Sequence, residues 1–128
     1  MLPKANRLRA ERDIKKVFKK GRRVMTLLFR FQILKTDAES TRFAIVVSTK
    51  VGKRATVRNL IKRRVRESLR ELMKTIPPGY DVVVQARTAS ITYTTEKEQG
   101  KRTPPERAAS YADIKADMVE FLSKMTAR

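Results

Sequence analysis

The chain has 128 residues, 41% of them hydrophobic, and this length and composition predict one compact domain. Its 31 Lys and Arg residues outnumber 13 Asp and Glu residues, and the net charge of +18 indicates a polyanionic partner, either a nucleic acid or an anionic membrane surface. The absence of Cys and His excludes disulfides, Cys/His zinc sites and acid–base catalysis by imidazole.

The positive charge is concentrated in the first part of the chain. Residues 1–70 contain 22 basic and 5 acidic side chains, whereas residues 71–128 contain 9 and 8. No apolar run approaches the roughly 20 residues that span a bilayer, and no apolar signal segment follows the basic N-terminus. We therefore expect a soluble, cytoplasmic protein.

The first predicted element is a short helix over about residues 10–20. Ile14, Val17 and Phe18 recur at helical spacing, and Gly21 supplies a stop. The opposite face carries Lys and Arg, so this helix must dock on the rest of the fold to be stable.

The next segments have the two-residue repeat of β-strands. Apolar and polar side chains alternate through much of residues 22–35, and the pattern leaves open whether this is one strand or two strands broken near Met25. A hairpin turn at residues 37–40 is followed by a second, more buried strand over residues 42–48.

The longest predicted helix covers about residues 56–74. Its apolar stripe has spacings of four and three and consists of Val57, Ile61, Val65, Leu69 and Leu72. Two prolines and Gly79 then turn the chain into a strand over residues 80–86, which has a buried centre.

The C-terminal part is predicted to contain a loop and a last helix. Residues from about 93 to 109 should form an exposed, mobile loop, because they are polar and contain a Pro pair. Ser110 is placed to cap the final helix, whose apolar face is formed by Ile114, Met118, Phe121, Leu122 and Met125. The element order α-β-β-β-α-β-α predicts a small single-domain α+β sandwich.

The long helix has an unusual concentration of positive charge. Residues 53–70 contain eight basic side chains and one acid, Glu67. Like charges four residues apart repel, and a surface made only for solubility would mix the two signs. This face therefore favours binding of a polyphosphate, with a solvated basic surface as the alternative.

Asn59 interrupts this basic face. Asparagine is a mediocre helix former, and its amide both donates and accepts hydrogen bonds, which suits a base edge, a sugar hydroxyl or the water shell of a metal ion. A residue at a helix start that bonds its local backbone is the alternative interpretation.

Four separated blocks of the sequence occur in the order found in one known family. They are Asn6-Arg7-Leu8 with Asp13-Ile14 and Val17-Phe18-Lys19-Lys20-Gly21; Ser48-Thr49-Lys50-Val51-Gly52; Arg58-Asn59-Leu60-Ile61-Lys62-Arg63 with Arg66-Glu67; and Pro78-Gly79-Tyr80-Asp81-Val82-Val83-Val84 with Ala86-Arg87. In these blocks the chain resembles the protein component of bacterial ribonuclease P, over about residues 4–90 and again from Tyr111.

The resemblance implies a subunit of a ribonucleoprotein. Its partners would be the catalytic RNA and precursor tRNA, with no membrane and no small-molecule substrate. The RNA, with Mg²⁺, would hydrolyse the precursor to mature the 5′ end of tRNA, while the protein shields phosphates, lowers the magnesium requirement and binds the 5′ leader. The resemblance also implies a left-handed crossover around the basic helix, against the general right-handed rule.

The resemblance implies two sets of binding residues and neither a catalytic residue nor a metal ligand in the protein. The set facing the catalytic RNA is Arg58, Asn59, Lys62, Arg63, Arg66, Lys53 and Arg54. The set lining or flanking a leader cleft between the first helix and the sheet is Phe18, Ile14, Phe29, Phe31, Lys50 and Arg87. Burial in the hydrophobic core is the alternative for the three phenylalanines.

The chain departs from the family pattern in three places. Leu60 stands where the family usually has Arg, which removes one expected RNA contact. Ile14 stands where an aromatic residue is usual, and residues 91–110 are an insertion before the last helix.

Three rival functions remain. A ribosomal-type or general structured-RNA-binding module fits the basic α+β composition, but it does not predict the ordered blocks. A protein nuclease would have to use Asp113, Asp117 and Glu120, which share one face of the last helix and in principle suit a magnesium ion. Binding at a membrane surface lacks an amphipathic helix with an exposed aromatic edge.

Overall fold

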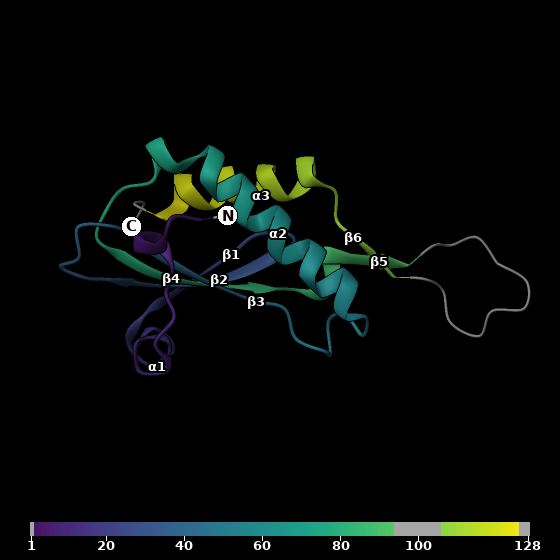
Figure 1. Ribbon diagram of the computed structural model, residues 1–128, viewed down its shortest axis with the longest axis horizontal. Helices are drawn as coiled ribbons and strands as arrows, with labels where there is room; N and C mark the ends of the chain where they lie inside the picture. Colours follow the sequence, from purple (N-terminus) through teal and green to yellow (C-terminus); the bar gives the residue numbers. More distant parts are fainter. Residues whose placement is uncertain (1, 94–105, 126–128) are drawn as a thin grey trace, which may run out of the picture.

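The computed structural model describes residues 2–93 and 106–125. A four-stranded sheet lies between α1 on one face and α2 and α3 on the other (Figure 1). The helices are α1 (Glu11–Lys20), α2 (Ala55–Glu71) and α3 (Tyr111–Met125), and the strands are β1 (Arg22–Met25), β2 (Phe29–Lys35), β3 (Arg42–Val46), β4 (Tyr80–Ala86), β5 (Ile91–Tyr93) and β6 (Glu106–Ala108). Short 3-10 turns lie at Lys4–Asn6, Met73–Thr75 and Thr88–Ser90. The predicted α+β sandwich is confirmed.

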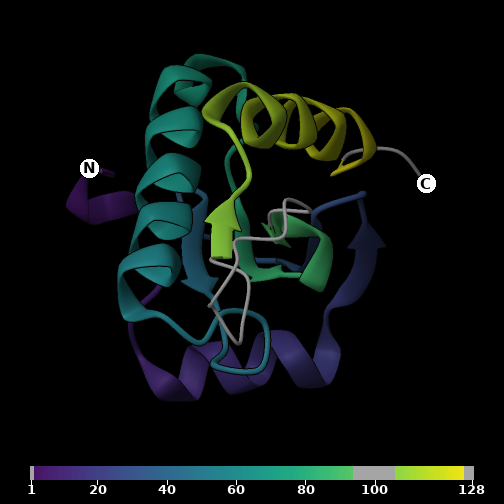
Figure 2. The same ribbon diagram turned by 90° about the vertical axis from the view of Figure 1, so that its right-hand side faces the viewer.

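The strand order of the main sheet is β1-β2-β4-β3. β1–β2 and β2–β4 are antiparallel, whereas β3 and β4 are parallel neighbours joined through α2. The chain leaves β3, passes over the sheet through α2 and returns in β4 as a left-handed crossover, which can be followed in Figures 1 and 2. β3 lies at the edge, where the backbone N–H of Leu8 donates to the carbonyl of Phe43 at 2.9 Å.

One face of the sheet carries the hydrophobic core. Phe29, Phe31 and Ile33 of β2 share this face with Val82 and Val84 of β4. The core is completed by the predicted apolar stripes of α2 and α3, whose fully buried members are Ile61, Val65, Leu69, Ile114, Met118, Phe121 and Met125. The two long helices therefore cover this face completely enough to exclude water from its aromatic side chains.

The opposite face is covered by α1 at one end only. Val17 is fully buried against Leu8 and Val83. Gly21 ends the helix in close contact with β2, because an added Cβ would lie 2.8 Å from the carbonyl oxygen of Ile33. Figure 2 shows α1 crossing beneath the strands rather than running along them. The part of this face near the end of β3 and the start of β2 is left outside the helix.

Three local predictions are refined by the structure. The segment 22–35 is two strands, because the chain turns at Thr26–Leu28 between β1 and β2. The long helix ends at Glu71 and continues as a 3-10 turn. Ser110 caps α3 as predicted, since its hydroxyl accepts the backbone N–H of Asp113 at 3.1 Å.

The predicted loop within residues 91–110 is wrong at its two ends. β5 and β6 pair as an antiparallel ribbon, and the N–H of Ala109 donates to the carbonyl of Ser90 at 2.7 Å. Ile91 is buried, which anchors the start of the ribbon in the core. The central part of the predicted loop, residues 94–105, lies outside the described residues.

Candidate nucleic-acid interface

The basic side chains of α2 lie on the side of the helix that the core leaves free. Burial of Val57, Ile61 and Val65 orients the helix. Asn59 and Arg63 are exposed, and Lys62 and Arg66 are partly exposed. Amphipathic spacing alone thus brings these four predicted RNA-binding residues to one accessible side.

A groove of about 1110 Å³ runs between α2, the edge strand β3 and the N-terminal segment. Asn59, Arg63 and Arg66 line it from α2, and Arg7 and Arg9 line it from the opposite wall. Glu67 is the single acid among the lining residues. The groove therefore has cationic walls over an apolar floor, a combination that suits a phosphate backbone with its attached sugars and bases.

The residues before α2 form a loop that Arg58 holds in place. The Nη1 of Arg58 donates to the carbonyls of Gly52 and Lys53, each at 2.8 Å. Gly52 packs so closely on Ile91 that a Cβ would lie 2.4 Å from its methyl carbon. Lys53 and Arg54, by contrast, are exposed. Arg58 accordingly supports the loop that presents these two cations, besides its predicted role as a contact.

Leu60 lies in the groove wall, partly buried. The Nη1 of the nearby Arg64 donates to the carbonyl of Ala109 at 2.6 Å. That bond ties α2 to the segment after β6. The groove consequently has an apolar patch at the position where the family pattern has a cation.

Phe18 and Ile14 lie on the flank of α1 that faces the uncovered end of the sheet. Asp13 marks the other flank, since its carboxylate is 3.6 Å from the Nη2 of Arg42 near the covered end. Phe18 lies about 140° around the helix axis from Asp13, and Ile14 about 100°. Ile14 lines the groove and Phe18 is 43% exposed, so both side chains are accessible on this flank, and their role in a leader cleft stays a prediction.

The prediction that Phe29 and Phe31 line the leader cleft is wrong. Both side chains are fully buried on the face covered by α2 and α3. Their rings are 6.2 Å apart, and Phe31 stacks on Phe121 of α3. The core alternative holds for both of them, because the strand turns this face away from α1.

The side chains at the uncovered end of the face that α1 packs on were not among the predicted site residues. The strand register places Met25, Arg30, Gln85 and Val46 side by side across all four strands. Met25 is 40% and Val46 39% exposed. The Nε of Arg30 is buried and has no hydrogen-bond partner among the described residues. The sequence pattern that could have identified Arg30 is its position between Phe29 and Phe31, because alternation along a strand places Arg30 on the face opposite to the two phenylalanines.

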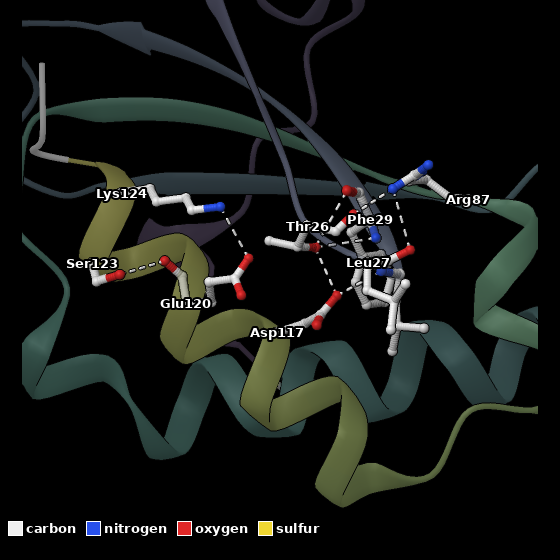
Figure 3. Close-up of polar contacts among 9 residues, drawn as sticks. Thr26, Leu27, Phe29, Arg87, Asp117, Glu120, Ser123 and Lys124 are labelled. Atoms are coloured by element: carbon white, nitrogen blue, oxygen red, sulfur yellow. Dashed lines mark hydrogen bonds and ion pairs between the residues drawn. The ribbon is translucent and has the colours of Figure 1, made fainter.

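Lys50 and Arg87 follow the ends of the parallel strands β3 and β4, so both lie at this end of the sheet. Lys50 is exposed. Arg87 is partly buried, and its Nη1 donates to the carbonyls of Thr26 at 2.6 Å and Leu27 at 3.3 Å (Figure 3). Arg87 therefore has a fixed position beside the β1–β2 turn.

The three acidic residues of α3 do not converge on one point. Asp117 bonds the β1–β2 turn, and Glu120 pairs with Lys124 at 3.1 Å (Figure 3). Within residues 2–93 and 106–125, no group of three or more carboxylates is placed to hold a metal ion. In the same residues no helix has the length and apolar character needed to cross a membrane.

These features define a small, strongly basic α+β domain with a left-handed crossover and a groove that has cationic walls. The sequence profile of the family described as Ribonuclease P matches residues 2–102. The ribonuclease P protein component of Picosynechococcus sp. is 41% identical over 86 residues, which cover 67% of this chain and 74% of the relative. That of Petrotoga mobilis is 34% identical over 124 residues, covering 97% and 94%.

A solved structure agrees with these relatives. The RNase P protein from Thermotoga maritima superposes with a TM-score of 0.72 at 30% identity, covering 92% of this chain and 96% of that one. The chain therefore belongs to the ribonuclease P protein family.

Proposed function

We propose that this chain is the protein subunit of a bacterial ribonuclease P ribonucleoprotein, and that it promotes 5′-end maturation of tRNA in the cytoplasm. The observation that carries the proposal is the juxtaposition of two surfaces. The exposed basic side of α2 meets the uncovered end of the sheet around the edge strand β3, and Ile14, Val46 and Asn59 all line the groove between them. One protein surface thus has room for two RNA segments.

In this proposal the catalytic RNA binds the α2 side. Arg63 and Arg66 would neutralise phosphates from one flank of the groove, and Lys53 and Arg54 would extend the contact beyond the start of the helix. Cationic side chains that replace condensed counterions on RNA add affinity that falls steeply with salt. Asn59, exposed between these cations, is placed to bond a base edge or a ribose hydroxyl.

The single-stranded 5′ leader of precursor tRNA would bind across the uncovered end of the sheet. Phe18 offers an exposed aromatic face on which an unpaired base can stack without sequence preference. Arg30 lies on the floor with a buried Nε that lacks a partner among the described residues. Lys50 and Arg87 flank this floor at the ends of β3 and β4 and would follow the phosphates.

Hydrolysis itself would belong to the RNA, which holds the Mg²⁺ in this proposal. The described residues contain no carboxylate cluster for a metal ion, so we assign neither a metal site nor a chemical step to the protein. Its contribution is electrostatic: it screens RNA phosphates, which reduces the magnesium needed, and it adds binding energy at the leader.

The proposal is tested by binding of the reconstituted ribonucleoprotein to precursor tRNA and to mature tRNA without a leader. We expect the protein to increase affinity for the precursor well above its effect on mature tRNA, and Phe18→Ala to remove most of this difference. A general structured-RNA-binding module would raise both affinities equally. Equal increases in affinity for the two RNAs would therefore replace our proposal with that alternative.

A further inference from the structure

The β1–β2 turn, residues Thr26 to Leu28, is held from two sides by polar contacts. Asp117 Oδ2 accepts the hydroxyl of Thr26 at 2.6 Å and the backbone N–H of Leu28 at 2.7 Å. Arg87 bonds the carbonyls of Thr26 and Leu27 through its side chain, and its backbone N–H donates to the carbonyl of Leu28 at 2.8 Å. Figure 3 shows Asp117 and Arg87 reaching the turn from different sides.

Packing alone does not explain an aspartate at position 117, because burying its carboxylate costs free energy. Its side chain comes from α3, whose other inward residues are apolar, and the residue is only 9% exposed. Removing a carboxylate from water costs free energy that its hydrogen bonds must offset. Thr26 is likewise buried, at 4% exposure. The carboxylate of Asp117 and the hydroxyl of Thr26 form a hydrogen bond with each other, and this bond fixes the conformation of the β1–β2 turn.

The β1–β2 turn holds the side chain of Arg87 in place. Only its Nη1 contacts the two turn carbonyls, and its other side-chain N–H groups have no partner among the described residues. A guanidinium anchored by one nitrogen keeps a set direction for the remaining donors, which can then meet a phosphate in a defined geometry. Arg87 is itself a member of the surface assigned to the leader.

We propose that Asp117 is a positioning residue for leader binding, which acts through the Thr26–Leu28 turn to hold Arg87 toward the leader phosphates. This inference rests on the proposed function, because it needs a leader to be bound. In this proposal Asp117 does not contact RNA. It holds the β1–β2 turn through two hydrogen bonds, and two carbonyls of the turn hold the guanidinium of Arg87.

The test compares three variants of the reconstituted ribonucleoprotein, with precursor and mature tRNA as the probes. Asp117→Ala removes both acceptor contacts and should lower the preference for precursor over mature tRNA about tenfold, roughly the loss of one hydrogen bond to a charged group. Asp117→Asn should retain most of the preference, because one amide oxygen can accept both donors that now share Oδ2. Glu120→Gln is the matched control one turn along the same helix and should change nothing.

A double-mutant cycle with Arg87→Ala separates positioning from general destabilisation. If Asp117 acts through Arg87, Asp117→Ala should produce no further loss in the Arg87→Ala background. Additive losses, or an unchanged preference in Asp117→Ala, would overturn the inference. If Asp117→Ala does not fold, Thr26→Val removes one of the two hydrogen bonds to Asp117 from the turn and should lower the preference in the same direction, by a smaller factor.

The wild-type measurement separates failure of the proposed function from failure of the role given to Asp117. A wild-type protein without precursor preference would contradict the proposed function and this inference together. A wild-type preference that survives both Asp117→Ala and Thr26→Val would contradict only the inference.

Discussion

Phe31 of β2 and Phe121 of α3 stack with their ring centroids 3.8 Å apart and their planes 8° from parallel. This contact commits one face of the sheet to the core, because both rings are fully buried. The opposite face, which α1 covers at one end only, is consequently the one that keeps an accessible area, and our proposal places the leader there. Substitutions on the two faces should therefore affect stability and RNA binding differently.

Phe31→Ala and Phe18→Ala should have opposite consequences. We expect Phe31→Ala to lower the free energy of unfolding by about 3–5 kcal/mol, since it leaves a cavity between the sheet and α3. Phe18→Ala should cost less than about 1 kcal/mol, because its ring is 43% exposed, yet it should weaken precursor binding by about 1–3 kcal/mol if a base stacks there. Urea unfolding and precursor binding measure the two effects. If Phe18→Ala were strongly destabilised but bound the precursor normally, Phe18 would be a core residue and not an RNA contact.

Arg63→Ala should change the salt dependence of binding to the catalytic RNA. With six to eight phosphates neutralised, the logarithm of the affinity should fall against the logarithm of salt concentration with a slope of roughly −4 to −7. Removal of one phosphate contact should reduce the magnitude of that slope by about one. Lys124→Ala removes the same charge from α3, where Lys124 pairs with Glu120, and should leave the slope unchanged. Equal slopes for the two variants would show that net charge, not the groove, determines binding.

Asp81→Asn should destabilise the parallel pair of strands that the crossover creates. Asp81 is 4% exposed and accepts two hydrogen bonds from Arg42, at 2.9 and 2.7 Å. Breaking a buried pair costs about 3–5 kcal/mol, and we expect about 2 kcal/mol because Arg42 retains access to water. In a denaturant titration, the exposed Glu11–Lys15 pair is the control, and Glu11→Gln should cost less than about 0.5 kcal/mol. Similar losses for the two variants would mean that the Arg42–Asp81 pair contributes no more than a surface pair.

Tyr111 should titrate at an unusually high pH. Burial of its phenol and the hydrogen bond to Glu71 at 2.6 Å raise the pKa of Tyr111 to about 12. Because the folded pKa lies above the unfolded value of about 10, this contact stabilises the fold fully below pH 10 and the contribution is lost as the pH rises toward 12. The phenolate absorbance difference between wild type and Tyr111→Phe should have its midpoint near 12. A midpoint near 10 would mean that the α2–α3 contact is open in solution.

The order of elements could be predicted from the sequence, because period and caps are local properties. Gly21 and Ser110 end α1 and begin α3 where expected. Which face of β2 is buried in the core could not be predicted, since alternation gives two faces and does not say where the helices will dock. The phenylalanines were assigned to the wrong face, and Arg30 was overlooked for the same reason.

The remaining differences are tertiary in origin. β5 and β6 are three residues each, too short for a periodic signal, and they exist because their segments meet in space. The burial of Asp117 depends on a turn 89 to 91 residues away in the sequence. From the sequence alone, an aspartate on an amphipathic helix is expected to face solvent, and only the position of the β1–β2 turn in the fold shows that Asp117 is buried.

Cleavage of a precursor tRNA at low magnesium tests the central claim most directly, in three reactions that contain protein alone, catalytic RNA alone, and both. The account predicts activity only in the mixture, reduced when Arg63 and Arg66 are both replaced by Ala. Cleavage by the protein alone would contradict it and indicate a protein nuclease. A mixture no more active than the RNA alone would equally contradict it, and would leave a general RNA-binding module as the better description.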